Sequence, residues 1–161
     1  MILEYCKVRD NAITPERANP SDAGLDVFFC PNPIAADWGA ADHGIDLSPG
    51  QSVILGTGLK FAVPHGYMLE VKNRSGNAAK KHLLVGACVV DSGYDGEVFI
   101  NLHNVGRTPQ LIEPGMKIAQ VVLIPVVNFR PMEIAEEELY SYPMTISNRG
   151  DGALGSTDAH D

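Results

Sequence analysis

Sixteen glycines and 11 prolines interrupt this chain of 161 residues at roughly the spacing that separates strands in a β-sandwich or barrel. The stretches between them have the periodicity of strands. Residues 97–104 (EVFINLHN) alternate, which places Val98, Ile100 and Leu102 on one face. Residues 118–127 (IAQVVLIPVV) are nearly all apolar and rich in β-branched side chains, which predicts a strand covered on both faces. The sequence therefore predicts an all-β fold.

Other stretches are shorter or irregular. Residues 52–64 and 67–73 are predicted to form further short strands bounded by glycine and proline. Helix signals are weak: residues 77–81 (NAAKK) predict about one turn, and residues 132–140 (MEIAEEELY) fit either a short helix or an edge strand. Residues 30–50 are long for a connection within a compact β domain, which predicts an excursion on the surface.

The length of the chain suits one domain with its own core. We expect this domain to span residues 1–147. The remaining residues, 148–161 (NRGDGALGSTDAHD), contain three glycines and little that can pack, so they are expected to form a flexible tail.

Charge and composition exclude several classes of function. The net charge of −8 disfavours binding to a nucleic-acid backbone, although it is compatible with a small phosphorylated ligand. No apolar run approaches the roughly 20 residues that cross a bilayer, and the N-terminus lacks the pattern of a signal peptide. The three cysteines have no CxxC spacing, so no disulfide framework is expected. We therefore expect a cytoplasmic protein, in the host cytoplasm if it is viral, with no membrane or nucleic-acid partner.

Three polar stretches are candidates for chemistry. Arg74, Ser75 and Gly76 follow a predicted strand and offer donors suited to phosphate oxygens, but they are equally consistent with a solvated turn. In residues 89–97 (VVDSGYDGE), Asp91 ends an apolar run, either as a turn residue or as a reacting group. Glycines, hydroxyls and one arginine in the tail suit an anion, whereas plain disorder explains them as well. The five histidines are scattered without metal-ligand spacing.

Taken in order, these stretches resemble the five motifs of the trimeric dUTPase family. The matching segments are AGLD (23–26), RSG (74–76), GACVVDSGYDGE (86–97), GMKIAQ (115–120) and RGDGALGST (149–157). The resemblance implies a distorted jelly roll or β-barrel of the β-clip type that assembles as a homotrimer with active sites at subunit interfaces. It also implies Mg²⁺-dependent hydrolysis of dUTP to dUMP and pyrophosphate, a reaction that limits uracil incorporation into DNA and supplies dUMP.

The resemblance assigns the nucleoside to the hairpin of the third motif. Asp91 matches the aspartate that activates the water attacking the α-phosphorus, a role suited to a carboxylate. Tyr94 matches the tyrosine whose ring packs beneath the deoxyribose and excludes a 2′-hydroxyl. Cys88, Val89 and Phe99 lie where the backbone of the family's hairpin contacts the base.

The phosphates are assigned to other motifs. Arg74, Ser75 and Gly76 match the family's phosphate-contacting turn, which a neighbouring subunit supplies. Gln120 matches the glutamine near the α-phosphate, and Asp26 matches a supporting carboxylate that is expected to pair with Arg74. The family binds Mg²⁺ chiefly through phosphates and water, so no direct protein ligand is expected.

The tail matches the lid of the family, with two departures. Arg149 matches the arginine that closes over the γ-phosphate, and Gly155 and Ser156 supply further donors. Leu154 stands where the family usually has a phenylalanine that caps the uracil, and it covers a base without stacking on it. Asp158 adds a negative charge close to the expected triphosphate.

Two alternatives remain open at this point. The related dCTP deaminases share the fold, but their reaction needs a glutamate where this chain has Asn101, which cannot act as a general acid or base. A regulatory protein that binds a nucleotide without hydrolysing it is the other alternative, and turnover would distinguish the two classes.

Overall fold

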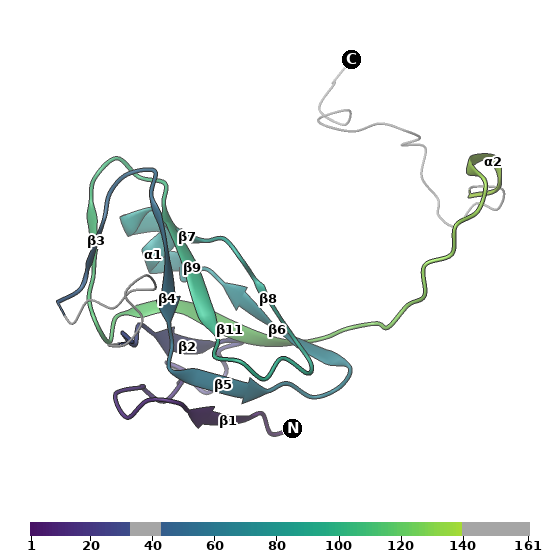
Figure 1. Cartoon of the computed structure of the whole chain (residues 1–161), viewed down its shortest axis with the longest axis horizontal. Helices are drawn as coiled ribbons and strands as arrows, with labels where there is room; N and C mark the ends of the chain where they lie inside the picture. Colours follow the sequence, from purple (N-terminus) through teal and green to yellow (C-terminus); the bar gives the residue numbers. More distant parts are fainter. Residues whose placement is uncertain (33–42, 140–161) are drawn as a thin grey trace, which may run out of the picture. The chain divides into compact units, whose positions relative to one another are not determined.

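The computed structural model describes residues 1–32 and 43–139 (Figure 1). The chain divides into two compact units, Met1–Asn128 and Phe129–Asp161. The predicted domain end at residue 147 and the predicted tail, 148–161, lie outside the described residues.

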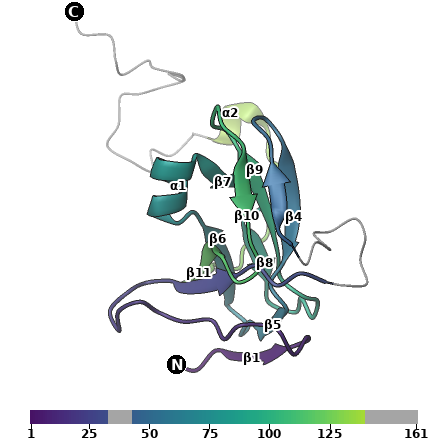
Figure 2. The same ribbon diagram turned by 90° about the vertical axis from the view of Figure 1, so that its left-hand side faces the viewer.

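Short strands are the main regular elements of the first unit. In chain order they are β1 (Glu4–Lys7), β2 (Leu25–Phe28), β3 (Ile45–Leu47), β4 (Ser52–Gly56), β5 (Leu59–Ala62), β6 (Tyr67–Lys72), β7 (Leu83–Val85), β8 (Val89–Asp91), β9 (Phe99–Asn104), β10 (Gln110–Ile112) and β11 (Lys117–Pro125). The helix α1 (Ser75–Lys81) stands beside β7 (Figure 2). In the second unit the described helix is α2 (Glu136–Leu139), so helix is the correct one of the two alternatives for residues 132–140.

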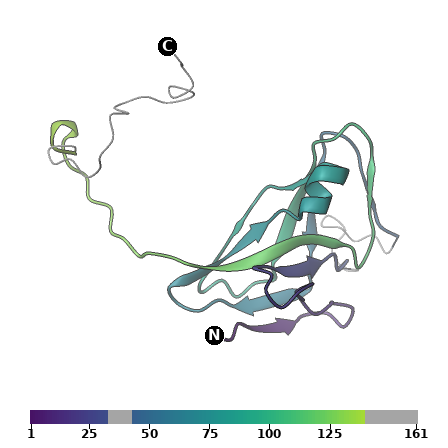
Figure 3. The same cartoon turned by 180° about the vertical axis from the view of Figure 1, so that it is seen from behind.

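The strands pair in antiparallel sheets. A four-stranded sheet has the order β2-β11-β6-β8, and a three-stranded sheet has the order β4-β9-β7. Two ribbons, β1-β5 and β10-β3, complete the unit. The long strand β11 runs between β2 and β6 and is seen lengthwise in Figure 3. The predicted all-β class is confirmed.

The two strongest strand predictions agree with the structure to different degrees. In β9 and the residue before it, the exposed fractions of Val98, Ile100 and Leu102 are only 2%, 0% and 0%, as the alternation predicts. In β11, Ile118, Ala119 and Val121 are buried, whereas Gln120 and residues 122–124 are only partly covered. Cover on both faces is therefore present over only part of β11 in the single chain.

The excursion and the helix both contain more structure than the sequence indicated. Of the predicted excursion, residues 33–42 lie outside the described residues, and residues 45–47 form β3, which pairs with β10. The helix α1 begins two residues before the predicted turn. It ends at Lys81, and the next residue, His82, has a left-handed backbone (φ 54°), a conformation common just after a helix.

Candidate functional site

Asp26 lies between two cations on the edge strand β2. Its side chain is nearly buried, and Arg74 donates from Nε to Oδ1 at 2.7 Å and from Nη2 to Oδ2 at 3.3 Å. The Nζ atom of Lys117 lies 2.9 Å from the same Oδ2. The expected pairing of Asp26 with Arg74 is therefore present. It uses two of the five N–H donors of the guanidinium and fixes its plane.

Lys117 was not predicted as part of this cluster. Hydrogen bonds to Asp26 and, next in size, to Glu16 raise the pKa of Lys117, so its ammonium group remains charged through the neutral range. The ammonium nitrogen also lies 5.5 Å from the centre of the Phe28 ring. Two cations thus hold the Asp26 carboxylate in one position.

Strand register brings these side chains together. Gln120 on β11 is opposite Asp26 on one side and opposite Lys72 on the other. Arg74 follows two residues after Lys72, as the chain leaves β6 and enters α1. Residues far apart in sequence therefore form one row across the four-stranded sheet.

This row borders a cavity of about 320 Å³. All five residues predicted for the phosphate side line it: Asp26, Arg74, Ser75, Gly76 and Gln120. The side chain of Gln120 donates from Nε2 to the carbonyl of Asn73 at 3.0 Å. A Cβ atom at Gly24 would overlap the end of the Gln120 side chain, so a larger residue there would displace this amide. The cavity combines a fixed guanidinium, a hydroxyl and an amide, which are groups that bind phosphate oxygens.

The turn that joins β8 to β9, called the hairpin below, presents the second group of predicted residues. β8 pairs with β6, and β9 pairs with β4 and β7, so these described strands do not pair with each other as a β-hairpin would. Asp91 ends β8, and its carbonyl accepts a hydrogen bond from the N–H of Tyr94 at 3.2 Å. Gly93 has a φ of +93° in this turn, which favours glycine. Asp91 is exposed, and 46% of Tyr94 is accessible to solvent. The hairpin therefore offers a carboxylate and an aromatic ring to a ligand.

A cavity of about 210 Å³ lies inside this hairpin. The predicted residues Val89, Asp91, Tyr94 and Phe99 line it. Cys88 is not among its lining residues, although its carbonyl accepts a hydrogen bond from the N–H of Val71 at 2.7 Å. The structure thus groups four of the five hairpin residues around one space and leaves Cys88 just outside it.

The two cavities lie apart within one chain. Asp91 is opposite Met68 near the start of β6, and Lys72 is four residues further along that strand. At about 3.3 Å per residue this is about 13 Å, and Arg74 lies beyond Lys72. The carboxylate and the guanidinium of the same chain are therefore not positioned to act on one phosphate group.

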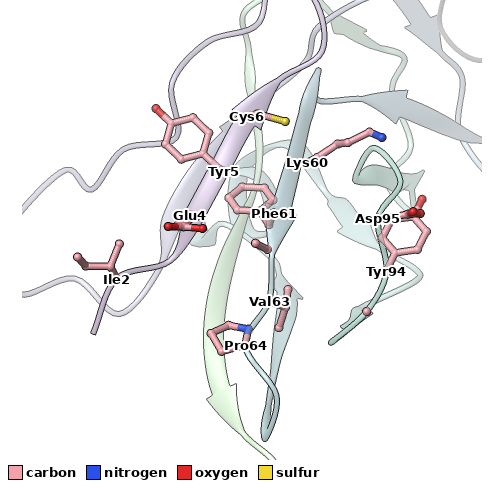
Figure 4. A pocket seen from close by; sticks show the side chains of 12 residues that line it. Ile2, Glu4, Tyr5, Cys6, Lys60, Phe61, Val63, Pro64, Tyr94 and Asp95 are labelled. Carbon is pink, nitrogen blue, oxygen red and sulfur yellow. The ribbon is translucent and has the colours of Figure 1, made fainter.

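A third cavity, of about 830 Å³, lies between the β1-β5 ribbon and the tip of the hairpin. Figure 4 shows Tyr94 and Asp95 across this groove from Tyr5 and Phe61. Tyr94 lines both this groove and the hairpin cavity. Its ring therefore forms a wall between the two spaces.

The predicted site residues of the tail lie outside the described residues. The tail residues Arg149, Leu154, Gly155 and Ser156 belong to residues 140–161, which are not described. Within residues 1–32 and 43–139, no group of three or more histidine, cysteine or acidic side chains is arranged to hold a metal ion. No helix in this part of the chain has the length and apolar character of a membrane span.

The described residues thus form an all-β protein with one cavity lined by groups that bind phosphate oxygens and a second, less polar cavity at the hairpin. The family model described as dUTPase matches residues 10–157. The chain is 35% identical over 156 residues to the deoxyuridine 5′-triphosphate nucleotidohydrolase of Chlamydia trachomatis serovar L2, covering 95% of this chain and 96% of that protein. A protein of the same name from Clostridium acetobutylicum is 35% identical over 157 residues, with coverage of 96% and 95%. The chain belongs to the dUTPase family.

Solved structures agree on the fold. The dUTPase of Staphylococcus bacteriophage 80alpha with dUPNHPP has a TM-score of 0.73 and 24% identity, covering 96% of this chain and 97% of that one. The dUTPase of phage phi11 of S. aureus has a TM-score of 0.73 and 24% identity, with coverage of 88% and 100%.

Proposed function

We propose that this protein hydrolyses dUTP to dUMP and pyrophosphate by attack of water on the α-phosphorus. The observation that carries this proposal is the hairpin cavity, where a carboxylate and a tyrosine face the same space. Curated relatives that are 35% identical over nearly the whole chain are named for this activity. The reaction lowers the dUTP available for incorporation into DNA and supplies dUMP.

Asp91 is the general base in this proposal. Its exposed carboxylate accepts a proton from water while the water oxygen forms a bond to the α-phosphorus. The bond between the α-phosphorus and its bridging oxygen breaks, and pyrophosphate leaves with that electron pair. Arg74, Ser75 and Gly76 bind phosphate oxygens, and Gln120 orients the α-phosphate. These donors stabilise the charge that accumulates on the phosphate oxygens.

The remaining hairpin residues select the nucleoside. Tyr94 packs against the deoxyribose and leaves no space for a 2′-hydroxyl, while the backbone at Val89 and Phe99 contacts the base. Cys88 contributes through its place just before β8, where its carbonyl accepts a hydrogen bond from the N–H of Val71. In this scheme shape selects the sugar and backbone groups select the base.

Mg²⁺ is the proposed cofactor, and when bound it neutralises the triphosphate charge. The donors around the phosphate cavity fit an ion that is carried by the nucleotide rather than by the protein. Asp26, the buried carboxylate there, is already held by Arg74 and Lys117, and so is not free to act as a metal ligand. Asp26 instead positions Arg74 for the phosphates.

We also propose a homotrimer in which neighbouring chains complete each site. The separation of Asp91 from the phosphate cavity within one chain, about 13 Å along β6 to Lys72 and more to Arg74, supports this arrangement. The partly covered second half of β11 is consistent with burial against another chain. Each site then takes its hairpin from one subunit and its Arg74 turn from another.

Pyrophosphate release tests the proposed activity. We expect release from dUTP and little or none from dCTP, dTTP or UTP, and loss of turnover after Mg²⁺ is removed with EDTA. Ammonia release from dCTP would instead indicate a deaminase. That outcome is not expected because the Asn101 amide already lies 2.6 Å from the His103 ring and offers no carboxylate. Tight dUTP binding without pyrophosphate release would indicate a regulatory binding protein.

The tail is proposed to act as a lid, with Arg149, Gly155 and Ser156 on the phosphates and Leu154 over the base. An aromatic ring stacks on a base more favourably than leucine, by about 0.5–1.5 kcal/mol. We therefore expect Leu154→Phe to lower KM for dUTP by about 2- to 10-fold, measured by steady-state kinetics. Leu154→Met, which changes shape but adds no ring, is the control. Equal KM values for the two variants would contradict the role of Leu154.

A further inference from the structure

The segment just before β9 is held to the N-terminal part of the chain by an ion pair between Glu97 and Arg9. Arg9 donates to both carboxylate oxygens of Glu97, from Nη1 to Oε2 at 2.7 Å and from Nη2 to Oε1 at 2.5 Å. The side chains are only 15% and 11% exposed. Such a bidentate, partly desolvated pair is geometrically more specific than a surface ion pair.

Surrounding groups fix both members of this pair. Arg9 also donates from Nη2 to the carbonyl of Cys30 at 3.0 Å and from Nε to the Cys30 thiol at 3.4 Å. The Oε1 atom of Glu97 accepts a further hydrogen bond from the N–H of Gly58 at 2.7 Å. A Cβ atom at Gly56 would lie 2.7 Å from Nη2 of Arg9. Glycine at this position therefore leaves space for the guanidinium. We call the pair of Arg9 and Glu97 the hairpin clamp.

The hairpin clamp reaches Tyr94 through the backbone of Glu97. The Tyr94 hydroxyl donates to the carbonyl oxygen of Glu97 at 2.8 Å. The phenol also lies against Gly96, where a Cβ atom would collide with it. The ring is therefore folded back along its own hairpin and is anchored at the residue that Arg9 holds.

This anchor determines which of two spaces the ring occupies. On one side is the hairpin cavity of about 210 Å³, and on the other is the open groove of about 830 Å³ beside β1 and β5 (Figure 4). With its hydroxyl bound, Tyr94 stays at the wall between them. Without the bond, the groove gives the ring room to turn away from the hairpin cavity, and this rotation enlarges the cavity that receives the sugar.

We propose that Arg9 and Glu97 are positioning residues that set the discrimination between deoxyribose and ribose by holding the Tyr94 ring in place. This inference rests on the proposed hydrolysis of dUTP. Glu97 lines the hairpin cavity, but its carboxylate is bound by Arg9 and by the N–H of Gly58, so in this scheme the clamp binds neither the phosphates nor the base. Its loss therefore affects the ratio of kcat/KM for dUTP to kcat/KM for UTP more than it affects hydrolysis of dUTP.

The test compares variants that break the same chain of contacts at different points. Arg9→Met removes the cation, Glu97→Gln weakens the pair, and Tyr94→Phe removes only the hydroxyl anchor. Each is expected to lower the dUTP/UTP ratio about 3- to 10-fold, the effect of one hydrogen bond. Arg9→Lys, which keeps the charge, should restore part of the ratio lost in Arg9→Met. Adding Arg9→Met to Tyr94→Phe should lower the ratio by less than about twofold more, because both changes break one chain of contacts.

Ile112→Val is the matched control. The side chain of this buried residue on β10 is apolar and takes no part in the hydrogen bonds of the clamp or of Tyr94. Its truncation to valine lowers the free energy of unfolding by about 0.5–1.5 kcal/mol. It should lower the melting temperature without changing the dUTP/UTP ratio. An unchanged ratio in both Glu97→Gln and Tyr94→Phe would overturn the proposal. If Arg9→Met does not fold, Arg9→Lys and Glu97→Gln decide the question.

A second measurement separates this inference from the proposed function. If the wild-type protein releases no pyrophosphate from dUTP, the proposed function is wrong, and the position of the ring is then tested without any nucleotide. Selective ¹³C labelling of tyrosine, with Tyr94→Phe to assign the signal, should show a shifted Tyr94 ring resonance in Glu97→Gln and an unshifted one in Ile112→Val. A Tyr94 resonance that is the same in Glu97→Gln and wild type would refute the clamp.

Discussion

Replacing Asp91 with asparagine is expected to lower kcat for dUTP by about 10²- to 10⁴-fold, the usual contribution of a positioned general base. The amide keeps the size of the side chain but cannot accept the proton from water. Folding should be retained because Asp91 is exposed at the end of β8 and contributes its backbone carbonyl, not its side chain, to the turn. Single-turnover pyrophosphate release measures the chemical step, and titration with a nonhydrolysable dUTP analogue measures binding.

Asp95 provides the control for this substitution. It lies on the same hairpin, is exposed, and faces the groove beside β1 and β5 rather than the hairpin cavity (Figure 4). Asp95→Asn removes the same charge from nearly the same place and should leave kcat within about twofold of wild type. If Asp91→Asn retains more than about a tenth of the wild-type kcat, Asp91 is not the base.

The sequence predicted the longer strands and missed the shortest ones, of three residues each, for a physical reason. β9 and β11 are six and nine residues long, so their apolar patterns repeat often enough to be recognised. β3, β7 and β10 have three residues each, too few to show a period. Their strand conformation depends on a partner that is distant in sequence, as when β3 pairs with β10.

The candidate site likewise has a part that depends on residues close in sequence and a part that depends on distant strands. Asp91 and Tyr94 belong to one motif, and their shared cavity follows from a local turn. The phosphate cavity depends on register, because Gln120 reaches Asp26 only through the pairing of β11 with β2. The resemblance to known motifs supplied that grouping, since spacing gives no indication of it.

Contacts outside the motifs could be predicted neither from the local sequence pattern nor from the resemblance to known motifs. Lys117 joins Asp26 across a pair of strands, and its residue type alone predicts only a solvated charge. Arg9 and Glu97 are 88 positions apart, and nothing in their local sequence marks them as partners. Side chains that position functional residues from a distance are therefore found only when the chain is folded.

The second large effect concerns Arg74 and the assembly. Arg74→Ala removes the fixed guanidinium from the phosphate cavity and leaves the nearly buried Asp26 carboxylate with Lys117 alone. We expect it to lower kcat/KM for dUTP by about 10²-fold or more, because a charge-assisted bidentate contact to phosphate is lost. Arg74→Lys keeps the charge without the planar fork and should fall between Arg74→Ala and wild type.

Mixing two inactive chains tests whether sites are shared. If Asp91 and Arg74 of one site come from different subunits, a chain carrying Arg74→Ala and a chain carrying Asp91→Asn complement each other. Random assembly at equal amounts gives a wild-type Asp91 at half of the sites and a wild-type Arg74 at half. About a quarter of the sites then have both, so activity should rise to about a quarter of wild type after the chains are unfolded and refolded together.

The controls make this result specific to subunit exchange. Parent proteins mixed after separate refolding should stay inactive, and a chain carrying both substitutions should not be rescued by either parent. Light scattering of the wild-type protein should give three times the 17.3 kDa mass of one chain. A fully active species of one chain mass would contradict shared sites. Asp91 and Arg74 of one chain would then have to act on the same nucleotide. The distance from Asp91 to Lys72 along β6, about 13 Å, opposes this, and Arg74 lies further on than Lys72.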